Sequence, residues 1–392
     1  MSPDVLSTWK AGLRKDLRSL EERSLCRTLA EIHGVNFCSN DYLGLAENPA
    51  LRESLAESIG SATRVGGTGS RLLSGQTEEW RELEERFAGF AGTEAALFFS
   101  TGYAANMGLL ASLVGKDDVI YSDALNHASL IDGMRLSGAR KVIYPHLDLQ
   151  VLEKALLQDT GAPWRRVIVT ESVFSMDGDL APLGKIAELA EKYGAALIVD
   201  EAHATGVHGP YGRGLSAAAD IERQVLAIIH TCGKALGSAG AFVCGPAVLK
   251  EYLVNHARTF VFSTALPPYF ARQIGAALNL AGTMDQERHE LLQRSARLVE
   301  NLRAAGFKTA RTESQIVPVV LGAVAETLDA ADYLQRDGFA VRAIRPPTVP
   351  EGSARLRLSL TSKIPEAELM RLVKSLVTWR SRQATAAVAK RA

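Results

Sequence analysis

Short apolar runs alternate with amphipathic stretches between residues 93 and 246, and this alternation limits the possible folds more than any other feature. Each run has the length of a buried strand, and the stretches between them, such as residues 183–193, carry apolar residues at helical spacing. Apolar strands separated by helices indicate a mostly parallel sheet that is covered on both faces. The sequence therefore predicts an α/β domain with a seven-stranded sheet, with strands at residues 95–99, 119–122, 141–144, 167–170, 195–199, 226–229 and 241–244.

Other patterns flank this region. Helical spacing predicts an N-terminal helix over residues 4–30 and a long helix over 271–305, and residues 35–45 are expected to form a strand that ends in a polar turn. A small α+β unit is expected after the long helix, with strands at 316–321, 341–344 and 355–360 and helices at 325–337 and 365–380. We therefore expect a helical arm (1–40), a large domain (41–285) and a small C-terminal domain (286–392).

Charge and cysteine usage restrict the partners and the compartment. The 44 basic residues balance 44 acidic residues, so no broad electrostatic attraction to nucleic acid or to a membrane is expected. The four cysteines show neither a paired spacing nor a metal-binding spacing, which is typical of a reducing cytosol. The first residues lack a basic start followed by an apolar run, so we expect no signal peptide and a cytoplasmic location.

A lysine follows the strand predicted at residues 226–229. The polar cluster of residues 230–234 ends in Lys234, and glycines at 233, 237 and 240 let the backbone turn sharply there. A lysine at the tip of a buried strand can lose its proton and act as a nucleophile, as a Schiff-base lysine must. A surface lysine in a glycine-rich turn is the alternative interpretation.

An anion site is indicated where residues 95–99 lead into a helix. Residues 100–106 place Gly102 and Tyr103 at the helix start, where free backbone N–H groups can bind a phosphate. An ordinary turn capped by Ser100 or Thr101 would give the same pattern. The upstream glycine-rich stretch, residues 66–71, lacks the Walker lysine and its spacing, so we interpret it as a mobile or tightly turned loop.

Further polar groups follow the other strands. His127 comes after residues 119–122, a turn rich in carboxylates and hydroxyls spans residues 171–179, and Asp200 directly follows residues 195–199. A structural histidine and a solvated loop are the alternatives for the first two. An acid at the end of an apolar strand is costly without a cationic partner. His203 and His208 are five residues apart without an evident third ligand, so no metal is expected.

Together these residues resemble the α-oxoamine synthases, enzymes that depend on pyridoxal 5'-phosphate (PLP) and have the type I fold of PLP-dependent transferases. The resemblance runs from about residue 39 to residue 360 and includes Ser129-Leu130 after His127. The remaining motifs are residues 39–45 (SNDYLGL), 69–75 (GSRLLSG), 171–179 (ESVFSMDGD), 200–203 (DEAH) and 231–234 (TCGK). The resemblance implies an α/β fold with a large PLP-binding domain and a small C-terminal domain.

The resemblance also implies roles in cofactor binding. Lys234 would hold PLP covalently and then act as acid and base, Asp200 would pair with the ring nitrogen, and His127 would stack on the ring. The other cofactor contacts implied by the family are His203 at the phenolic oxygen, Ser175 in the cofactor site, Gly102, Tyr103 and Thr231 at the phosphate, and Thr264 at the phosphate of the partner subunit's cofactor. A shared site of this kind implies a homodimer.

Substrate contacts are implied in the same way. Arg357 is expected to clamp the substrate carboxylate, with Arg355 on the same strand face as the alternative. Asn40 would contact the same substrate. The acyl chain or the product would meet Arg345 and Thr348, and Arg27 loosely matches the family's N-terminal substrate arginine.

Within the family, residues 343–350 and 354–361 most resemble the members that catalyse one particular reaction. In that reaction L-alanine condenses with pimeloyl-CoA or with a pimeloyl carrier protein (pimeloyl-ACP), CO2 and the thiol leave, and the amino ketone enters biotin biosynthesis. A relative that joins glycine to acetyl-CoA is the alternative. A binding or regulatory protein with the same fold is a third possibility, against which the joint presence of Lys234, Asp200 and His127 argues.

Overall fold

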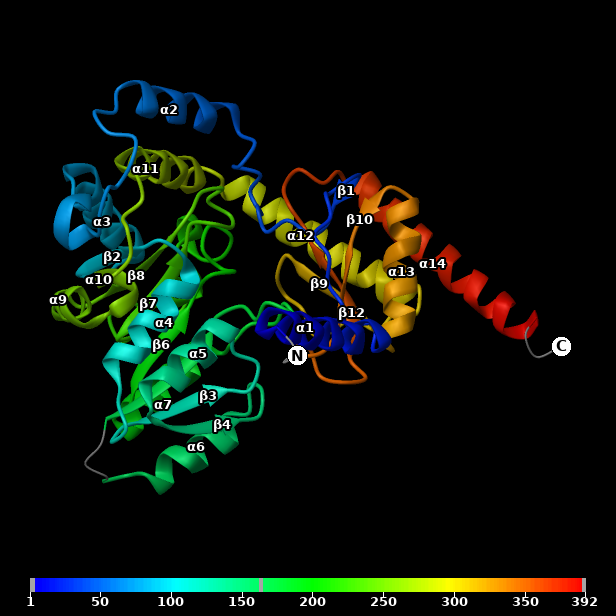
Figure 1. Cartoon of the computed structure of the whole chain (residues 1–392), viewed down its shortest axis with the longest axis horizontal. Helices are drawn as coiled ribbons and strands as arrows, with labels where there is room; N and C mark the ends of the chain where they lie inside the picture. Colours follow the sequence, from blue (N-terminus) through cyan, green and yellow to red (C-terminus); the bar gives the residue numbers. More distant parts are fainter. Residues whose placement is uncertain (1–3, 162–164, 390–392) are drawn as a thin grey trace. The chain divides into compact units, whose positions relative to one another are not determined.

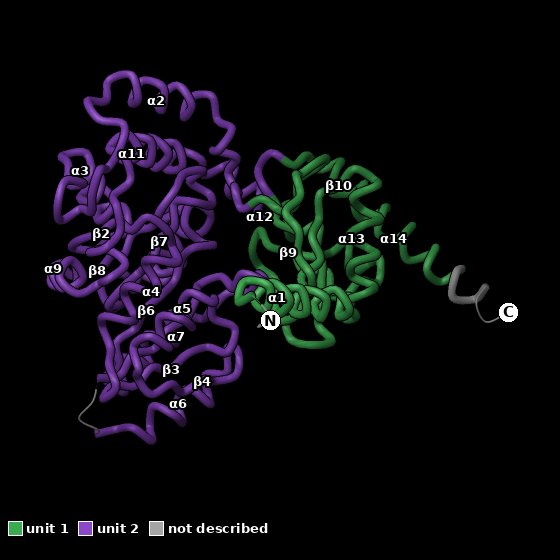
Figure 2. Tube along the Cα trace, in the orientation of Figure 1, with its two compact units in different colours: residues 1–39, 294–360, 364–392 green, residues 40–293, 361–363 purple. Residues whose placement is uncertain are grey.

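The computed structural model describes residues 4–161 and 165–389. Two compact units make up the chain (Figure 2), and they do not follow a single cut in the sequence. Unit 1 contains Met1–Ser39, Arg294–Leu360 and Ile364–Ala392, and unit 2 contains Asn40–Gln293 and Thr361–Lys363. The division into domains at residues 40 and 285 stays a prediction.

Unit 2 is built on the seven-stranded sheet that the sequence predicts (Figure 1). Six strands run parallel, and β8 lies antiparallel between β2 and β7. Each predicted apolar run lies within two residues of an observed strand. In spatial order the strands are β2 (Ala95–Phe99), β8 (Ala241–Gly245), β7 (Ala227–Thr231), β6 (Ala196–Asp200), β5 (Arg166–Glu171), β3 (Val119–Asp123) and β4 (Arg140–Tyr144).

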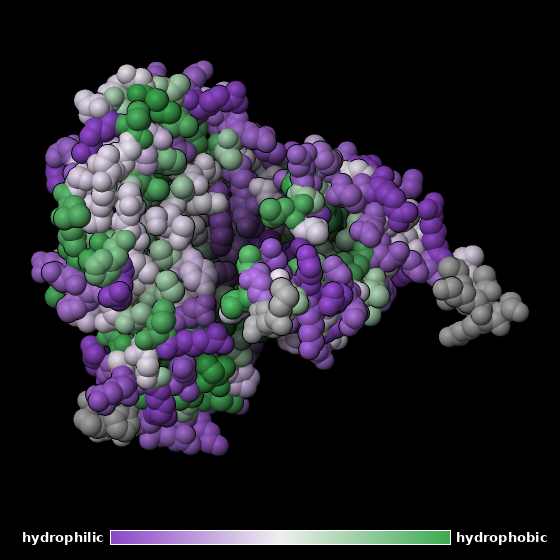
Figure 3. All heavy atoms as spheres, in the orientation of Figure 1, coloured by the Kyte–Doolittle hydropathy of each residue, from purple (hydrophilic) through white to green (hydrophobic). Residues whose placement is uncertain are grey.

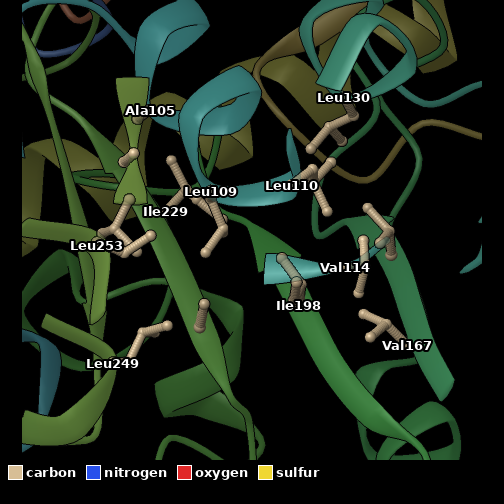
Figure 4. Close-up of a cluster of buried hydrophobic side chains, with 14 of the residues drawn as sticks. Ala105, Leu109, Leu110, Val114, Leu130, Val167, Ile198, Ile229, Leu249 and Leu253 are labelled. Carbon is tan, nitrogen blue, oxygen red and sulfur yellow. The ribbon is translucent and has the colours of Figure 1, made fainter. Parts of the chain in front are cut away.

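Helices bury both faces of this sheet, which explains why its strands are apolar throughout. On one face the side chains of alternate strand residues pack on α4 (Gly102–Leu113), α5 (Ala128–Ser137), α9 (Ala247–His256) and α10 (Arg258–Val261). Figure 4 shows this cluster, in which Leu109 and Ile229 are fully buried. On the opposite face Phe87 of α3 (Glu78–Ala91) stacks on Phe242 at 3.9 Å between ring centroids. Each buried leucine contributes about 2 kcal/mol to this core.

The remaining helices of unit 2 surround the sheet. They are α2 (Pro49–Gly60), the π-helix η1 (Arg71–Gly75), α6 (Leu149–Gln158), α7 (Leu183–Tyr193), the 3-10 helix η2 (Pro210–Gly212), α8 (Leu215–Ala218) and α11 (Pro268–Gly282). Because η1 follows the glycine-rich loop and a Cβ at Gly67 would lie 2.0 Å from the Ala265 carbonyl oxygen, this loop is tightly turned.

The prediction of one helix over residues 271–305 is wrong. The chain forms α11 and α12 (Asp285–Ala304) instead, with a turn between them in which the N–H of Thr283 donates to the Leu280 carbonyl. Gly282 and Thr283 have low helix propensity, and Asp285 carries a negative charge that favours a new helix N-terminus.

Unit 1 holds two small sheets. In the larger one the order is β11 (Arg342–Ile344), β12 (Ala354–Ser359) and β9 (Ile316–Gly322), all antiparallel. In the smaller one β1 (Val35–Asn36) pairs in parallel with β10 (Phe339–Ala340). This pairing connects the N-terminal part of unit 1 to the part that follows α13 (Val324–Arg336). Of the strand predicted over residues 35–45, only these first two residues pair, because the polar turn begins directly after them.

Three further helices belong to unit 1, α1 (Val5–Glu22), α13 (Val324–Arg336) and α14 (Glu366–Ala389). The predicted helix over 4–30 stops at Glu22, because Ser24 adopts a left-handed φ of 55° that ends the helix. Leu372, Leu376 and Trp379 of α14 are buried, whereas its outer side is mainly hydrophilic (Figure 3). Among the described residues, no helix combines the length and the hydropathy that crossing a bilayer requires.

Candidate active site

Lys234 lies just beyond the end of β7 and is half-buried. Its Nζ is 2.8 Å from Nε2 of His203, and Nδ1 of His203 is 2.6 Å from the hydroxyl of Tyr42. The turn that carries the lysine is possible only with glycine at 237, where φ is 53° and a Cβ would lie 2.5 Å from the backbone nitrogen of Ala46. The structure therefore excludes the interpretation of Lys234 as an isolated surface residue.

Asp200 ends β6 and is only 5% exposed. Its Oδ2 accepts from Nδ2 of Asn106 at 2.7 Å, and its Oδ1 accepts from the Ala202 N–H at 2.8 Å. Glu171 pairs with Asp200 on the neighbouring strand, and burial together with the Asp200 carboxylate raises the pKa of Glu171 well above its ordinary value. The two donors hold the Asp200 carboxyl group in a fixed orientation at the end of the strand.

His127 caps the N-terminus of α5 beside these groups. Its Nδ1 lies 2.7 Å from Oγ of Ser129, which also accepts from Asn106 at 2.9 Å. Burial lowers the pKa of His127. The Asp200 carboxylate opposes this shift, and the charge of Lys234 adds to it. His127 is therefore neutral at pH 7 and presents an uncharged aromatic ring. Asp200 and Lys234 can shift the pKa of His127 only because all three residues lie at the same edge of the sheet.

The N-terminus of α4 lies at this edge too. Thr101 caps the helix by accepting from the Ala104 N–H at 3.0 Å, while the N–H groups of Gly102 and Tyr103 have no acceptor within the helix. A Cβ at Gly102 would lie 3.8 Å from Cβ of Thr231, so the Thr231 side chain is next to the first helical turn. The structure shows the cap by Thr101, and the phosphate site at Gly102, Tyr103 and Thr231 stays a prediction that the two helix donors and the nearby hydroxyl suit.

The turn that contains Ser175 is held by its own backbone and by a histidine. The Phe174 N–H donates to the Asp179 carbonyl at 3.1 Å, and the side chain of Asp179 is 2.8 Å from Nε2 of His146. Nδ1 of His146 is 2.9 Å from Oδ1 of Asp123 at the end of β3. Burial alone would lower the pKa of His146, but its hydrogen bonds to the two carboxylates raise it to about 10. His146 thus ties together the turns that carry Ser175 and His127.

Two other predicted residues lie in unit 2. Thr264 pairs with Ser70 in an isolated antiparallel bridge and lines a small cavity with Ser100, the first residue after β2. Asn40 accepts from the Tyr42 hydroxyl through Oδ1 at 3.1 Å and is thereby connected to His203 and Lys234.

The other predicted substrate residues lie in unit 1. Arg27, Arg345 and Thr348 line one cavity of about 480 Å³. Arg345 donates to the carbonyl of Cys26 at 2.6 Å, which fixes the arginine at the cavity wall. Arg357 is buried on β12 and donates to Oγ of Ser359 at 2.6 Å. Arg355 is buried on the same strand and donates to the Ser353 carbonyl at 3.0 Å.

Sequence reasoning missed the residues that hold the predicted ones in place. Tyr42 lies inside the motif at 39–45, and Asn106 lies in the stretch that opens α4, but neither was given a role. Their partners are 161 and 94 residues away in the chain, so no local pattern reveals the contacts. In the described part of the chain, no group of three or more His, Cys, Asp or Glu side chains could hold a metal ion.

Comparison with known proteins decides the family. The model of the class I and II aminotransferase family matches residues 32–376. The 8-amino-7-oxononanoate synthase of Citrifermentans bemidjiense is 45% identical over 370 residues, which cover 91% of this chain and 94% of the relative. The chain belongs to this family, within its 8-amino-7-oxononanoate synthase group. The same synthase from Geobacter sulfurreducens is 45% identical and covers 93% of this chain and 94% of its own.

Solved structures in the family agree. Serine palmitoyltransferase from Sphingomonas wittichii has a TM-score of 0.89 at 29% identity and covers 97% of this chain and 99% of its own. The 8-amino-7-oxononanoate synthase from Francisella tularensis has a TM-score of 0.77 at 29% identity, covering 90% and 99%. These matches confirm the predicted type I fold and the α-oxoamine synthase resemblance. Other solved serine palmitoyltransferase structures that match the chain contain PLP, which confirms the dependence on this cofactor.

The residues of unit 2 suit PLP chemically. The cofactor has a phosphate, a basic ring nitrogen, an aromatic face and an aldehyde. The edge of the sheet offers two helix N–H groups that have no acceptor within α4, a buried carboxylate, a neutral imidazole and an amine. Asp200 in particular is a buried carboxylate that accepts from two neutral donors, Asn106 Nδ2 and the Ala202 N–H, so a protonated ring nitrogen would supply a cationic partner for it.

Proposed function

We propose that this chain catalyses the decarboxylative condensation of L-alanine with a pimeloyl thioester, giving 8-amino-7-oxononanoate, CO2 and the free thiol for biotin biosynthesis. The observation that carries the proposal is the 45% identity to curated 8-amino-7-oxononanoate synthases over more than nine-tenths of the chain. The strand-end groups at one edge of the sheet support it, because they match the chemistry that this reaction needs.

The cofactor residues have separate tasks. PLP, when bound, supplies an electron sink for the electrons left when the α-proton of the amino acid is removed. Lys234 holds the cofactor and moves the proton at the α-carbon, Asp200 stabilises the protonated ring nitrogen, and His127 covers the ring face. The phosphate contacts are proposed for Gly102, Tyr103 and Thr231. His203 is the proposed partner of the phenolic oxygen, and Ser175 is proposed to line the cofactor site.

Substrate binding is assigned to arginines because guanidinium groups bind carboxylates with two parallel hydrogen bonds. Arg357 is the proposed clamp for the alanine carboxylate, with Arg355 as the alternative, and Asn40 contacts the same substrate. The cavity of unit 1 supports a site for the acyl chain, since its wall carries Arg27, Arg345 and Thr348 and a pimeloyl group ends in a carboxylate.

The assembly and the compartment are also part of the proposal. We place the enzyme in the cytoplasm as a homodimer in which Thr264 reaches the phosphate of the partner subunit's cofactor. Neither nucleic acid nor a membrane is among the proposed partners.

A product assay tests the proposal. Purified protein loaded with PLP is supplied with L-alanine and pimeloyl-CoA or pimeloyl-ACP, and the products are identified by mass spectrometry. The proposal predicts 8-amino-7-oxononanoate and one equivalent of free thiol with at least one of the two donors. Turnover of glycine with acetyl-CoA, without any product from alanine and the pimeloyl donors, would contradict it and favour the alternative reaction.

A further inference from the structure

A line of hydrogen bonds leads from Lys234 into the interior of unit 2. Nζ of Lys234 lies 2.8 Å from Nε2 of His203, Nδ1 of His203 lies 2.6 Å from the Tyr42 hydroxyl, and that hydroxyl donates to Oδ1 of Asn40 at 3.1 Å. The residues come from the segment before α2, the turn after β6 and the turn after β7. Packing of distant segments, rather than local sequence, therefore creates the line.

The direction of each hydrogen bond follows from its far end. An amide oxygen can only accept, so the single proton of the Tyr42 hydroxyl points to Asn40. The Tyr42 oxygen must then accept from His203, which places the imidazole proton on Nδ1. Nε2 of His203 therefore carries a lone pair, and this lone pair accepts a hydrogen bond from Nζ of Lys234.

We propose that Tyr42 is a positioning residue that fixes His203 in the Nδ1–H tautomer and so orients the amine of Lys234. The tyrosine does not contact the amine and acts only through the histidine. His203 is also the proposed partner of the cofactor's phenolic oxygen. Its tautomer therefore decides whether Nε2 accepts a hydrogen bond from that oxygen or donates one to it. This inference rests on the proposed function only where it concerns catalysis.

Tyr42 is built to hold this position. Its side chain is 0% exposed and that of His203 only 5%, so water does not compete for the hydroxyl. The backbone is fixed on both sides, because the Tyr42 N–H donates to the Asn40 carbonyl at 2.8 Å and the Ser362 N–H donates to the Tyr42 carbonyl at 2.8 Å. A buried hydroxyl with a fixed backbone allows little rotation, and a hydrogen bond in such surroundings is stronger than one in water.

Nitrogen NMR tests the tautomer without any turnover. The full chain is labelled with 15N at histidine, and the ring signals of His203 are assigned from their absence in His203→Gln. We expect the protonated-type shift at Nδ1 and the unprotonated-type shift at Nε2. A protonated Nε2 in the unsubstituted chain would overturn the inference and would leave the proposed function untouched.

A hydroxyl deletion tests the positioning. In Tyr42→Phe both ring shifts of His203 should move towards their mean, and kcat should fall by up to about tenfold while the KM for L-alanine changes less than about twofold. Tyr121→Phe is the matched control, because Tyr121 is equally buried and its hydroxyl donates to Asp159, away from the lysine. Unchanged His203 shifts in Tyr42→Phe, or an equal loss of kcat in the control, would overturn the role of Tyr42.

Discussion

Asn106 Nδ2 lies 2.7 Å from Oδ2 of Asp200, and the same amide group donates to Ser129 at 2.9 Å. One side chain of α4 thus holds the carboxylate at the end of β6 and the serine that contacts His127. Asp200, proposed to bind the ring nitrogen, and His127, proposed to cover the ring face, are therefore fixed to a common support. Such indirect support is what keeps catalytic groups in place.

Replacement of Asn106 by alanine should weaken PLP binding. A hydrogen bond to a charged, buried group contributes about 1.5–3 kcal/mol, so the dissociation constant should rise roughly 10- to 100-fold. Titration of the cofactor-free protein with PLP measures this change. Asn255→Ala is the matched control, since Asn255 is exposed and its amide donates to the Glu251 carbonyl within α9. Equal affinities of the two variants would show that Asn106 does not support the site.

His146 should stabilise the protein in a pH-dependent manner. Its pKa is raised from 6.5 to about 10 in the folded state, because Asp123 and Asp179 outweigh the effect of burial. This stabilisation is fully present below pH 6.5 and disappears as the pH rises through about 10. The substitution His146→Gln should therefore reduce the free energy of unfolding by about 3 kcal/mol at pH 6 and by much less at pH 10. Urea unfolding at the two pH values measures this difference.

A control for His146 separates the ion pairs from a general effect of losing a histidine. His256 stacks on Tyr252 at the exposed end of α9 and makes no ion pair among the described residues. His256→Gln should therefore change the free energy of unfolding little, and equally at both pH values. A His146→Gln penalty that is independent of pH would contradict the assignment of the charge to His146.

Gly237 and Gly89 should respond in opposite directions to alanine. Gly237 has a left-handed φ of 53°, and a Cβ added there would lie 2.5 Å from the backbone nitrogen of Ala46. Gly237→Ala should therefore reduce the free energy of unfolding by about 3 kcal/mol and disturb the turn that carries Lys234. Gly89 lies in α3 with nothing within 4 Å, so Gly89→Ala should stabilise by up to about 1 kcal/mol. Thermal unfolding compares the variants, and equal melting temperatures would be inconsistent with the packing around Gly237.

The two arginines of β12 can be separated by conservative replacement. Lysine keeps the charge but loses the paired hydrogen bonds to a carboxylate, so Arg357→Lys should raise the KM for L-alanine by about tenfold or more. Arg355→Lys should change this KM much less, because Arg357 is the proposed clamp. Steady-state kinetics at a saturating acyl donor measures both values. The reverse order of effects would transfer the clamp to Arg355.

The sheet was predictable because its signal is local. Buried parallel strands read as apolar runs, and the residues that follow them, such as Lys234 and Asp200, must meet at one edge of the sheet. The helix break at Thr283 and the end of α1 at Glu22 were missed because helical spacing continues through both places in the sequence. Tyr42 could not be given its role from the sequence, since its contact with His203 spans 161 residues.

The attachment point of the cofactor tests the central claim most directly. PLP-loaded protein is reduced with borohydride, which fixes the cofactor permanently to the amine that holds it, and is then digested and analysed by mass spectrometry. The account predicts one modified peptide, with the added mass on Lys234, and no cofactor fixed to the protein by borohydride in Lys234→Ala. A cofactor fixed to another lysine, or to the protein of Lys234→Ala, would contradict it.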